Sequence, residues 1–364
     1  MTKLTAIILA VLMTFCLSTE SFGAAKSAVL IDGKSGRVLF EYNKDEKLPM
    51  ASTTKIMTAL IALEEENKDD YFVVNKAALA VEGSSMGLLE GDRVNLRTLA
   101  VGMLLASGND AANAAAIKIS GSVEKFVQLM NTRAKELGLK NTSFETPSGL
   151  DGENHYSTAY DMALLAKYAL QNPDFAEICS RKSIKVEFGN PPYSRWLLNH
   201  NRLLKDFEGT VGVKTGFTKK AGRCLVSAVE REEILLICVT LCCANDWEFH
   251  KNIYTEYFSK LESVPLESLV EKIEIPVSGG TEKTVTAVPK RVSAALFDNE
   301  KQKVKVKISK EPFVFAPVEK GKIIGTAYFY IENELVAKTP LLAEENIETL
   351  PENKGFWDEV KEIF

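Results

Sequence analysis

The chain has 364 residues, 46% of them hydrophobic, and a formal net charge of −5 at pH 7. This length is sufficient for one large domain and a smaller one. The mild acidity gives no electrostatic reason to expect nucleic acid as a partner.

The N-terminal residues have the pattern of an export signal. Lys3 precedes an almost unbroken apolar run over residues 4–17, and small residues occupy positions 23–25. A basic start, a short apolar middle and small residues at a cleavage point are typical of a signal peptide. An uncleaved anchor is the alternative, although the run is short for a membrane span. We expect a signal peptide over residues 1–25 and an exported, extracytoplasmic protein of the cell envelope.

A predicted β-hairpin over residues 28–42 is followed by Ser52-Thr53-Thr54-Lys55, which begins an apolar pattern typical of a helix. Residues three apart on a helix are neighbours, so Ser52 and Lys55 share a face. A serine needs a base to become a nucleophile, and a buried lysine near a second cation can lose its proton. Free N–H groups at the helix start can hold an oxyanion. A capping serine with a solvated lysine is the alternative for such a short motif.

The following segments predict mainly helices and then strands. Gly83 to Gly87 matches G-x-S-x-G around Ser85, but Gly91 argues against the helix that a nucleophile elbow requires, so a turn is expected. Helices are expected over residues 97–105, 111–119, 123–137 and 158–170, the last with a capping box at its start. Strands are expected over residues 184–188, 211–215, 223–230 and 234–241, with a closing helix over residues 250–261. Hairpin-connected strands indicate an antiparallel sheet. We expect an α/β fold of the α+β type, in which the sheet is flanked by helices and interrupted by a helical insertion.

The C-terminal part has a different pattern. Short alternating segments with Gly and Pro punctuation predict strands over residues 272–275, 284–289, 303–308, 324–330 and 335–338. We therefore expect a first domain over residues 26–263 and a small all-β domain over residues 264–349. The tail over residues 350–364 is amphipathic, and both a membrane-surface helix and a docked or frayed end remain open.

The cysteines after the signal segment do not predict a disulfide scaffold or a metal site. They are odd in number and lie in apolar sequence: Cys179, Cys224, Cys238, Cys242 and Cys243. Their spacing lacks the paired C-x-x-C of structural zinc sites, so small core residues are expected. A disulfide between two of them stays open. We expect no metal and no cofactor.

Two later stretches join Ser52 and Lys55 in a candidate site. Ser107-Gly108-Asn109 lies between two predicted helices, and the stretch from Lys214 to Thr218 lies on a predicted strand. The glycine within this strand permits close approach of a ligand backbone. A second lysine and two threonine hydroxyls lie beside it.

Taken together, S-x-x-K, S-x-N and K-T-G resemble the penicillin-recognising serine enzymes in their order and their element types. Their flanks, with Asn199-His200-Asn201 and residues 149–158, are similar to those of the D-alanyl-D-alanine carboxypeptidases, the low-molecular-mass penicillin-binding proteins. The resemblance covers residues 28–261 and continues more weakly through residues 316–321. It implies a β-lactamase-like, penicillin-binding transpeptidase fold. It also implies a peptidoglycan stem peptide ending in D-Ala–D-Ala as substrate and β-lactam antibiotics as acylating inhibitors.

The resemblance implies a role for each motif residue. Ser52 would attack the D-Ala–D-Ala carbonyl and form an acyl-enzyme, Lys55 would take its proton, and Ser107 would relay a proton to the leaving D-alanine. The base is disputed in this superfamily, so Lys55 is a hypothesis. The substrate and its developing charge would be held by Asn109, Lys214, Thr215, Gly216, Phe217 and Thr218.

Two departures and several alternatives accompany this interpretation. The arginine that part of the family carries soon after the last strand is missing from residues 245–250, and Val211 replaces an expected acidic residue. A β-lactamase would share the first step, but the middle motif is S-G-N and no matching glutamate motif follows it. A non-catalytic cell-wall peptide or penicillin sensor is a second alternative. A hydrolase built on Ser85, or one that uses a histidine at 155, 200 or 250, is a third.

Overall fold

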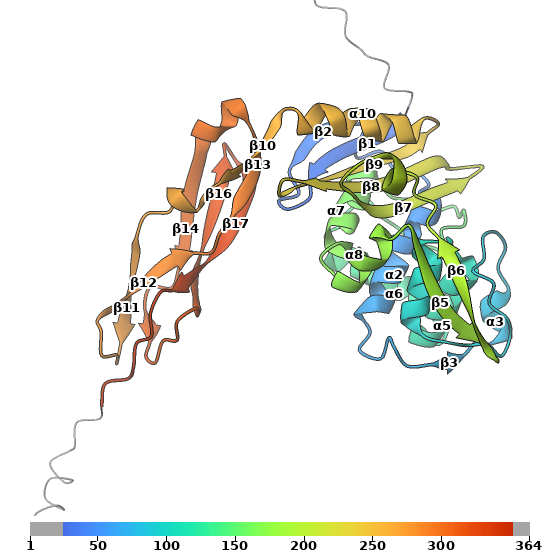
Figure 1. The fold of residues 1–364 in the computed structure, drawn as a ribbon, viewed down its shortest axis with the longest axis horizontal. Coiled ribbons are helices and arrows are strands. Elements are labelled where there is room, and N and C mark those ends of the chain that lie inside the picture. The colour runs from blue at the N-terminus through green and yellow to red at the C-terminus, as the bar shows by residue number, and fades with distance from the viewer. Residues whose placement is uncertain (1–24, 352–364) are drawn as a thin grey trace, which may run out of the picture. The chain divides into compact units, whose positions relative to one another are not determined.

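The computed structural model describes residues 25–351 (Figure 1). They form two compact units, one over residues 25–231 and 235–257 and the other over residues 232–234 and 258–351. The expected signal peptide up to residue 24 and the expected tail from residue 352 lie outside the described residues. Between residues 25 and 351, no helix is both long enough and apolar enough to cross a membrane.

The first unit is built on a five-stranded sheet with the order β2-β1-β9-β8-β7. Its strands are β1 (Ala25–Asp32), β2 (Val38–Tyr42), β7 (Thr210–Thr218), β8 (Gly222–Arg231) and β9 (Ile234–Cys243). β1 pairs antiparallel with β2 and β9, and β7 pairs antiparallel with β8. The expected antiparallel sheet and the expected hairpin over residues 28–42 are confirmed. β8 and β9 are buried along most of their length, as strands covered on both faces are.

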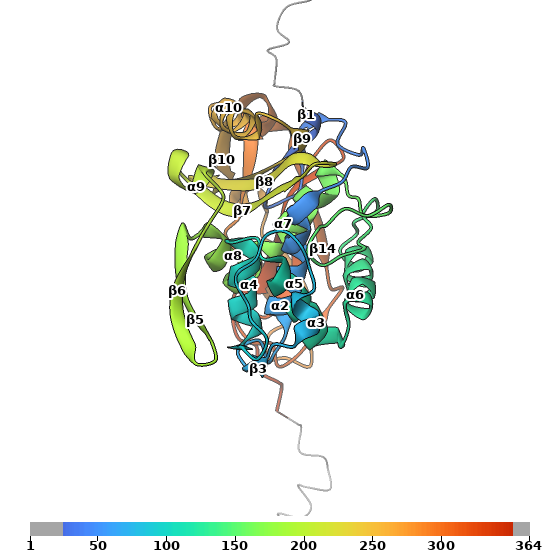
Figure 2. The same cartoon turned by 90° about the vertical axis from the view of Figure 1, so that its right-hand side faces the viewer.

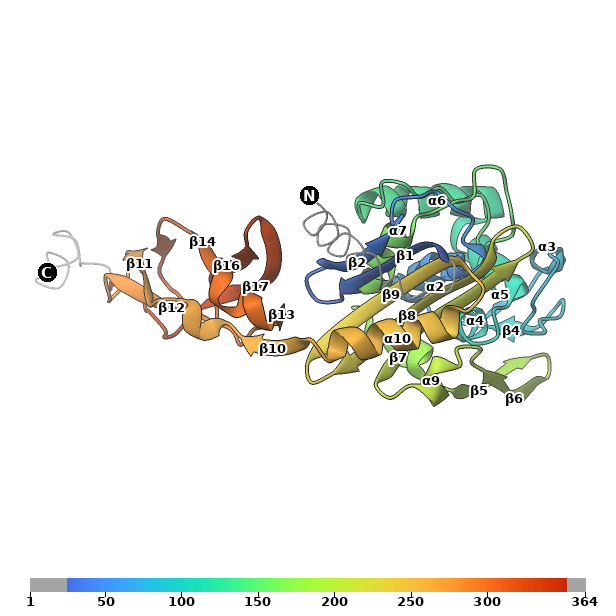
Figure 3. The same ribbon diagram turned by 90° about the horizontal axis from the view of Figure 1, so that it is seen from above.

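Helices cover both faces of this sheet (Figures 1 and 3). α10 (Asp246–Phe258) lies on one face, and α2 (Lys55–Glu64), α7 (Ala159–Ala169) and α8 (Pro173–Ser180) lie on the other. The expected closing helix at 250–261 was wrong in its bounds, because Leu261 already starts strand β10 (Leu261–Pro265). The expected capping box of α7 is half correct. Thr158 accepts a hydrogen bond from the N–H of Asp161, but the Asp161 carboxylate accepts from Asn141 and Thr142.

The helical insertion contains α3 (Lys76–Leu79), α4 (Leu96–Leu104), α5 (Asn109–Ser120) and α6 (Val123–Glu136). α4, α5 and α6 gather around α2 (Figure 2), and α3 packs against α5. The buried alanines of α5 allow α4 and α2 to pack closely against it. The side chains of Asn95 and Ser122 cap α4 and α6. A four-stranded sheet with the order β3-β4-β5-β6 lies at the edge of this region. Its members are β3 (Phe72–Val73), β4 (Arg93–Val94), β5 (Ser183–Gly189) and β6 (Pro192–Leu198), and α9 (Leu203–Asp206) connects it to β7.

The second unit is almost entirely β-structure, as expected. Its larger sheet has the order β14-β16-β17-β12-β11-β15, and a separate ribbon pairs β10 with β13. The strands are β11 (Ile273–Ser278), β12 (Thr284–Pro289), β13 (Ser293–Phe297), β14 (Val304–Lys310), β15 (Val314–Phe315), β16 (Ile323–Ile331) and β17 (Glu334–Ala343). All five expected strands are present. The alternation that predicted them places Ala327 and Phe329 in a separate small core.

Candidate active site

The Ser52 turn differs from the expected α-helical turn. Ser52 lies in a 3-10 turn (η1, Ala51–Thr54), and α2 begins only at Lys55. The hydroxyls of Thr53 and Thr54 donate to the carbonyls of Met50 and Ala51 over 2.6 and 2.8 Å, which tightens the turn. Its flanking residues are buried, whereas Ser52 is partly exposed. The turn therefore fixes a serine that remains accessible from one side.

Lys55 is completely buried and has three hydrogen-bond partners. Its Nζ lies 3.0 Å from Ser52 Oγ, 2.7 Å from Asn109 Oδ1 and 2.6 Å from the carbonyl oxygen of Ser148. The two carbonyl-type oxygens can only accept hydrogen bonds, whereas a hydroxyl can also donate one. A neutral lysine amine has two hydrogens and one lone pair. When both hydrogens are donated to the carbonyl oxygens, the lone pair is directed at the Ser52 hydroxyl.

The electrostatics of the site favour this neutral form. Burial, and then the charge of Lys214, hold the pKa of Lys55 well below its ordinary value of 10.5, while the Asp110 carboxylate opposes the shift. Burial also lowers the pKa of Lys214 to about 7. Because two ammonium groups in one buried site are poorly solvated and repel each other, keeping both lysines charged costs free energy.

Ser107, the first residue of the S-x-N motif, contacts the second lysine of the site, Lys214. It follows the C-terminus of α4 and has a left-handed backbone conformation, with φ of +59°. Its hydroxyl accepts a hydrogen bond from Lys214 Nζ over 3.2 Å, and Lys214 also donates to the carbonyl of Thr215. A non-glycine residue in this region is uncommon and strained, and such residues concentrate at functional sites.

Asn109 is the first residue of α5, two residues earlier than expected for this helix, and is held on both sides. Its Oδ1 accepts from Lys55, and its Nδ2 donates to the carbonyl of Glu82 over 2.6 Å. The neighbouring Asp110 carboxylate accepts hydrogen bonds from the Ser85 hydroxyl and from backbone N–H groups at 86–88 and 111. The start of α5 therefore anchors the loop over residues 82–88 beside Lys55.

Strand β7 packs directly on the Ser52 turn. A Cβ atom added to Gly216 would lie 3.1 Å from Met50 O, Ser52 N and Thr53 N, so the close approach needs a glycine here. The N–H groups of Ser52 and Phe217 thus belong to two segments in contact. The Phe217 ring is 65% exposed, and Thr218 ends the strand.

The loop over residues 145–157 forms the far side of the site. Besides the Ser148 carbonyl on Lys55, it offers the Pro147 carbonyl to the Thr58 hydroxyl. Gly149 has φ of +88° and lies so close to Ala51 that no side chain fits. These contacts fix the loop against the Ser52 turn.

The comparisons with known proteins agree with this geometry. The family described as D-alanyl-D-alanine carboxypeptidase matches residues 17–245, and the family described as penicillin-binding protein 5, C-terminal domain, matches residues 268–349. The chain belongs to the D-alanyl-D-alanine carboxypeptidase family.

Individual relatives align over most of this chain. The carboxypeptidase DacF of Bacillus subtilis is 34% identical over 361 residues, which is 94% of this chain and 92% of DacF. The carboxypeptidase DacC of Escherichia coli is 34% identical over 89% of this chain and 84% of its own length. The crystal structure of penicillin binding protein 5 from Haemophilus influenzae covers 90% of this chain and 98% of its own, with a TM-score of 0.68 and 29% identity.

The structure brings together most of the residues expected in this carboxypeptidase-family site. Hydrogen bonds link Ser52, Lys55 and Asn109, and a separate hydrogen bond links Ser107 to Lys214. Gly216 contacts the turn, while Thr218 bonds a residue that the sequence did not single out, Asp151. The other site groups missed from the sequence are the Ser148 carbonyl and the Asp110 carboxylate.

Arg223 is an arginine beside the end of β7. It lies on β8 directly opposite Phe217, and its guanidinium donates twice to the buried Asp246 carboxylate. The family arginine was expected after the last strand, whereas Arg223 lies on the strand before it. Only the pairing of β7 with β8 places Arg223 opposite Phe217, and no local motif indicates this position.

The serine and histidine alternatives have no support in the geometry. Ser85 lies in the 82–88 loop rather than between a strand and a helix, and it donates to Asp110. His155 bonds Thr54 and the N–H of Glu145, while His250 bonds Ser227 and Thr240. Within residues 25–351, no histidine hydrogen-bonds Ser52, and no acidic, histidine and cysteine side chains cluster as metal ligands. Cys179, Cys224, Cys238 and Cys242 are free thiols.

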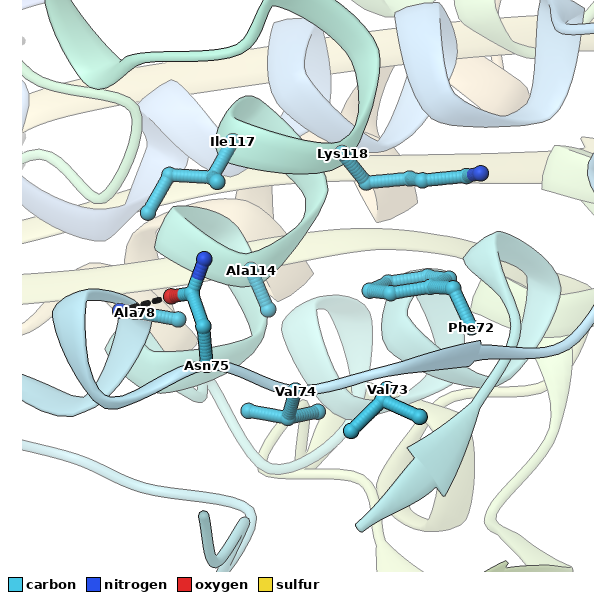
Figure 4. A pocket seen from close by; sticks show the side chains of 8 residues that line it. All are labelled: Phe72, Val73, Val74, Asn75, Ala78, Ala114, Ile117 and Lys118. Atoms are coloured by element: carbon cyan, nitrogen blue, oxygen red, sulfur yellow. Dashed lines mark hydrogen bonds between the residues drawn. The ribbon is translucent and has the colours of Figure 1, made fainter. Parts of the chain in front are cut away.

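A separate hollow of about 270 Å³ lies between the β3–α3 segment and α5 (Figure 4). The Lys118 ammonium lies 5.3 Å from the centre of the Phe72 ring at its rim. Ala114, another lining residue, is more than one helical turn beyond Asn109. This hollow is therefore distinct from the carboxypeptidase-family site.

Proposed function

We propose that this chain is a serine D-Ala-D-Ala carboxypeptidase that removes the terminal D-alanine from peptidoglycan pentapeptide stems through an acyl-enzyme on Ser52. The observation that carries the proposal is the set of three partners around Lys55. Of these partners, only the Ser52 hydroxyl can donate a proton to the amine. The family membership and the relatives' names support the same substrate class.

The first step uses Lys55 as the base. Its neutral amine takes the Ser52 proton while Ser52 Oγ attacks the carbonyl carbon between the two D-alanines. The N–H groups of Ser52 and Phe217 stabilise the developing oxyanion. Asn109, fixed by Lys55 and by the Glu82 carbonyl, binds the substrate backbone.

The second motif completes the bond cleavage. Ser107 donates its proton to the nitrogen of the departing D-alanine, and the adjacent Lys214 replaces that proton. Lys214, Thr215 and Thr218 hold the terminal carboxylate. Before the second step, Lys55 releases its proton to solvent and Lys214 takes one up. Water then attacks the ester carbonyl on Ser52, Lys55 takes the proton of that water and gives it to the departing Ser52 Oγ, and the shortened peptide is released.

The proposal includes an exported enzyme with a signal peptide over residues 1–25, a catalytic domain over 26–263 and a β-rich domain over 264–349. The apolar run behind Lys3 and its small-residue end support export. We further propose that β-lactams acylate Ser52 and that the tail over residues 350–364 contacts the outer face of the cytoplasmic membrane. The sequence pattern supports this contact, because Phe356, Trp357 and Phe364 would share one face of a helix.

The test compares purified mature protein with Ser52→Ala. Release of D-alanine from a peptide ending in D-Ala–D-Ala, and labelling by a fluorescent penicillin, should both occur in the wild type and both vanish in the variant. Labelling without D-alanine release would instead favour a sensor, and rapid penicillin turnover would favour a β-lactamase. Activity that survives Ser52→Ala would refute the proposal.

A further inference from the structure

The loop over residues 145–157 reaches the site at a second place, on the side of the terminal carboxylate. Thr218 Oγ1 donates to Asp151 Oδ1 over 2.9 Å. Two residues after Thr218, Lys220 Nζ donates to the carbonyl of Gly152, the residue next to Asp151, also over 2.9 Å. Two hydrogen bonds thus join Thr218, at the end of β7, and Lys220, just beyond it, to the loop whose Ser148 carbonyl binds Lys55.

The first of these bonds uses the only hydrogen of the Thr218 hydroxyl. Oγ1 also accepts a hydrogen bond from the N–H of Ala221 over 3.0 Å. A hydroxyl has one hydrogen, so it cannot donate to two carboxylates at once. The substrate carboxylate, which the proposed function places at Thr218, must therefore compete with Asp151 for that hydrogen.

Charge acts in the same direction. Asp151 carries a carboxylate within hydrogen-bond distance of the atom that is expected to bind a second carboxylate. Like charges at this separation near a protein surface repel, and salt screens the repulsion. Lys214 and Thr215 would attract the ligand from the β7 side, whereas Asp151 opposes it.

We propose that Asp151 is a specificity-determining residue that weakens the hold on a terminal carboxylate. The inference rests on the proposed function, because it takes Thr218 as part of the carboxylate site. Weaker carboxylate binding favours the release of the first product, D-alanine. This product also ends in a carboxylate and can reverse the reaction. The D-alanine amine would attack the ester carbonyl of the acyl-enzyme, Ser52 Oγ would leave with a proton, and the original peptide would re-form. Because Asp151 weakens the binding of the D-alanine carboxylate at Thr218, D-alanine departs before this return step. Water then completes the reaction.

The experiment compares Asp151→Asn with the wild type, using full mature protein and a peptide ending in D-Ala–D-Ala. The matched control is Glu153→Gln, which removes one negative charge from the same loop without a bond to Thr218. We expect Asp151→Asn to lower KM about three- to tenfold and to leave kcat within about twofold, with a smaller KM change in high salt. Exchange of labelled D-alanine into the peptide should rise by a similar factor. On a Thr218→Val background the substitution should change KM little.

The outcomes separate the inference from the proposed function. No hydrolysis by the wild type would overturn the proposed function itself. Normal wild-type hydrolysis with an unchanged or higher KM in Asp151→Asn would overturn only the role of Asp151. An equal KM decrease in Glu153→Gln would also overturn it, because a diffuse loop charge would then explain the effect.

Discussion

Gly149→Ala tests whether the 145–157 loop positions the base. Gly149 has φ of +88°, and its added Cβ would lie 2.0 Å from the carbonyl oxygen of Ala51. Cβ atoms essentially never come within 3.0 Å of such neighbours, so the loop and the turn must separate by about 1 Å. This movement would displace the Ser148 carbonyl on one side and Ser52 on the other.

The expected magnitudes follow from this separation. The left-handed conformation costs about 1–2 kcal/mol for alanine and the overpacking about 1–3 kcal/mol, which together lower Tm by roughly 5–15 °C. A misplacement of about 1 Å in reacting groups lowers the acylation rate by about 100-fold. Thermal melting measures the first effect, and the rate of labelling by a fluorescent penicillin measures the second.

Gly138→Ala is the matched control. Gly138 also has a positive φ, of +75°, but no atom lies within 4 Å of its added Cβ. It should therefore lose only about 1–2 kcal/mol of stability and keep the wild-type labelling rate. If folded Gly149→Ala labels as fast as Gly138→Ala, the loop does not position Lys55 and the reasoning is refuted.

Three further predictions concern charge. Lys55→Arg should lower penicillin labelling by about 10³-fold, because a guanidinium stays protonated and cannot accept the Ser52 proton; a rate within tenfold of wild type would exclude a lysine base. With a pKa of about 7, Lys214 is charged below pH 7 and loses its charge above it. Because this charge is proposed to hold the terminal carboxylate, kcat/KM for the peptide ending in D-Ala–D-Ala should fall as pH rises through about 7. Lys214→Arg should move this fall to higher pH, and an unchanged profile would contradict the assignment. Burial lowers the pKa of His250 to about 3 from 6.5, so the unfolded chain gains a proton below pH 6.5 that the native state does not. Stability from this group is complete above pH 6.5 and should decrease by about 2 kcal/mol by pH 5 in urea titrations, and His250→Gln should reduce that pH dependence.

Much of the site was predictable because its chemistry needs particular side chains at short spacings. Ser52 and Lys55 are three apart, and K-T-G lies within one strand, so local sequence specifies each contact. The Ser148 carbonyl could not be predicted, because every residue has one and only the fold selects which carbonyl faces Lys55. Asp151 meets Thr218 across 67 residues, a distance that no spacing rule covers.

The fold was predictable where periodicity was strong and less so elsewhere. Alternating strands and capped helices appear as expected, whereas β6 was missed because it begins at a proline and most of its residues are exposed. α8 was not predicted, although its sequence carries a helix start signal: Asn172 caps it and Pro173 occupies its first turn. The α10–β10 boundary failed because Leu261 continues the apolar pattern into a strand.

The pairing of β1 with β9 has a consequence for folding kinetics. β1 pairs with the nearby β2 on one side, but on its other side Ala28 lies opposite Thr240, more than two hundred residues later in the chain. Contacts this distant in sequence close slowly, because the chain must lose loop entropy before pairing rewards it. The Ser52 turn likewise meets β7 only once residue 216 is in place. A chain shortened before β7 therefore cannot form the site, and covalent penicillin labelling becomes a stringent reporter of completed folding.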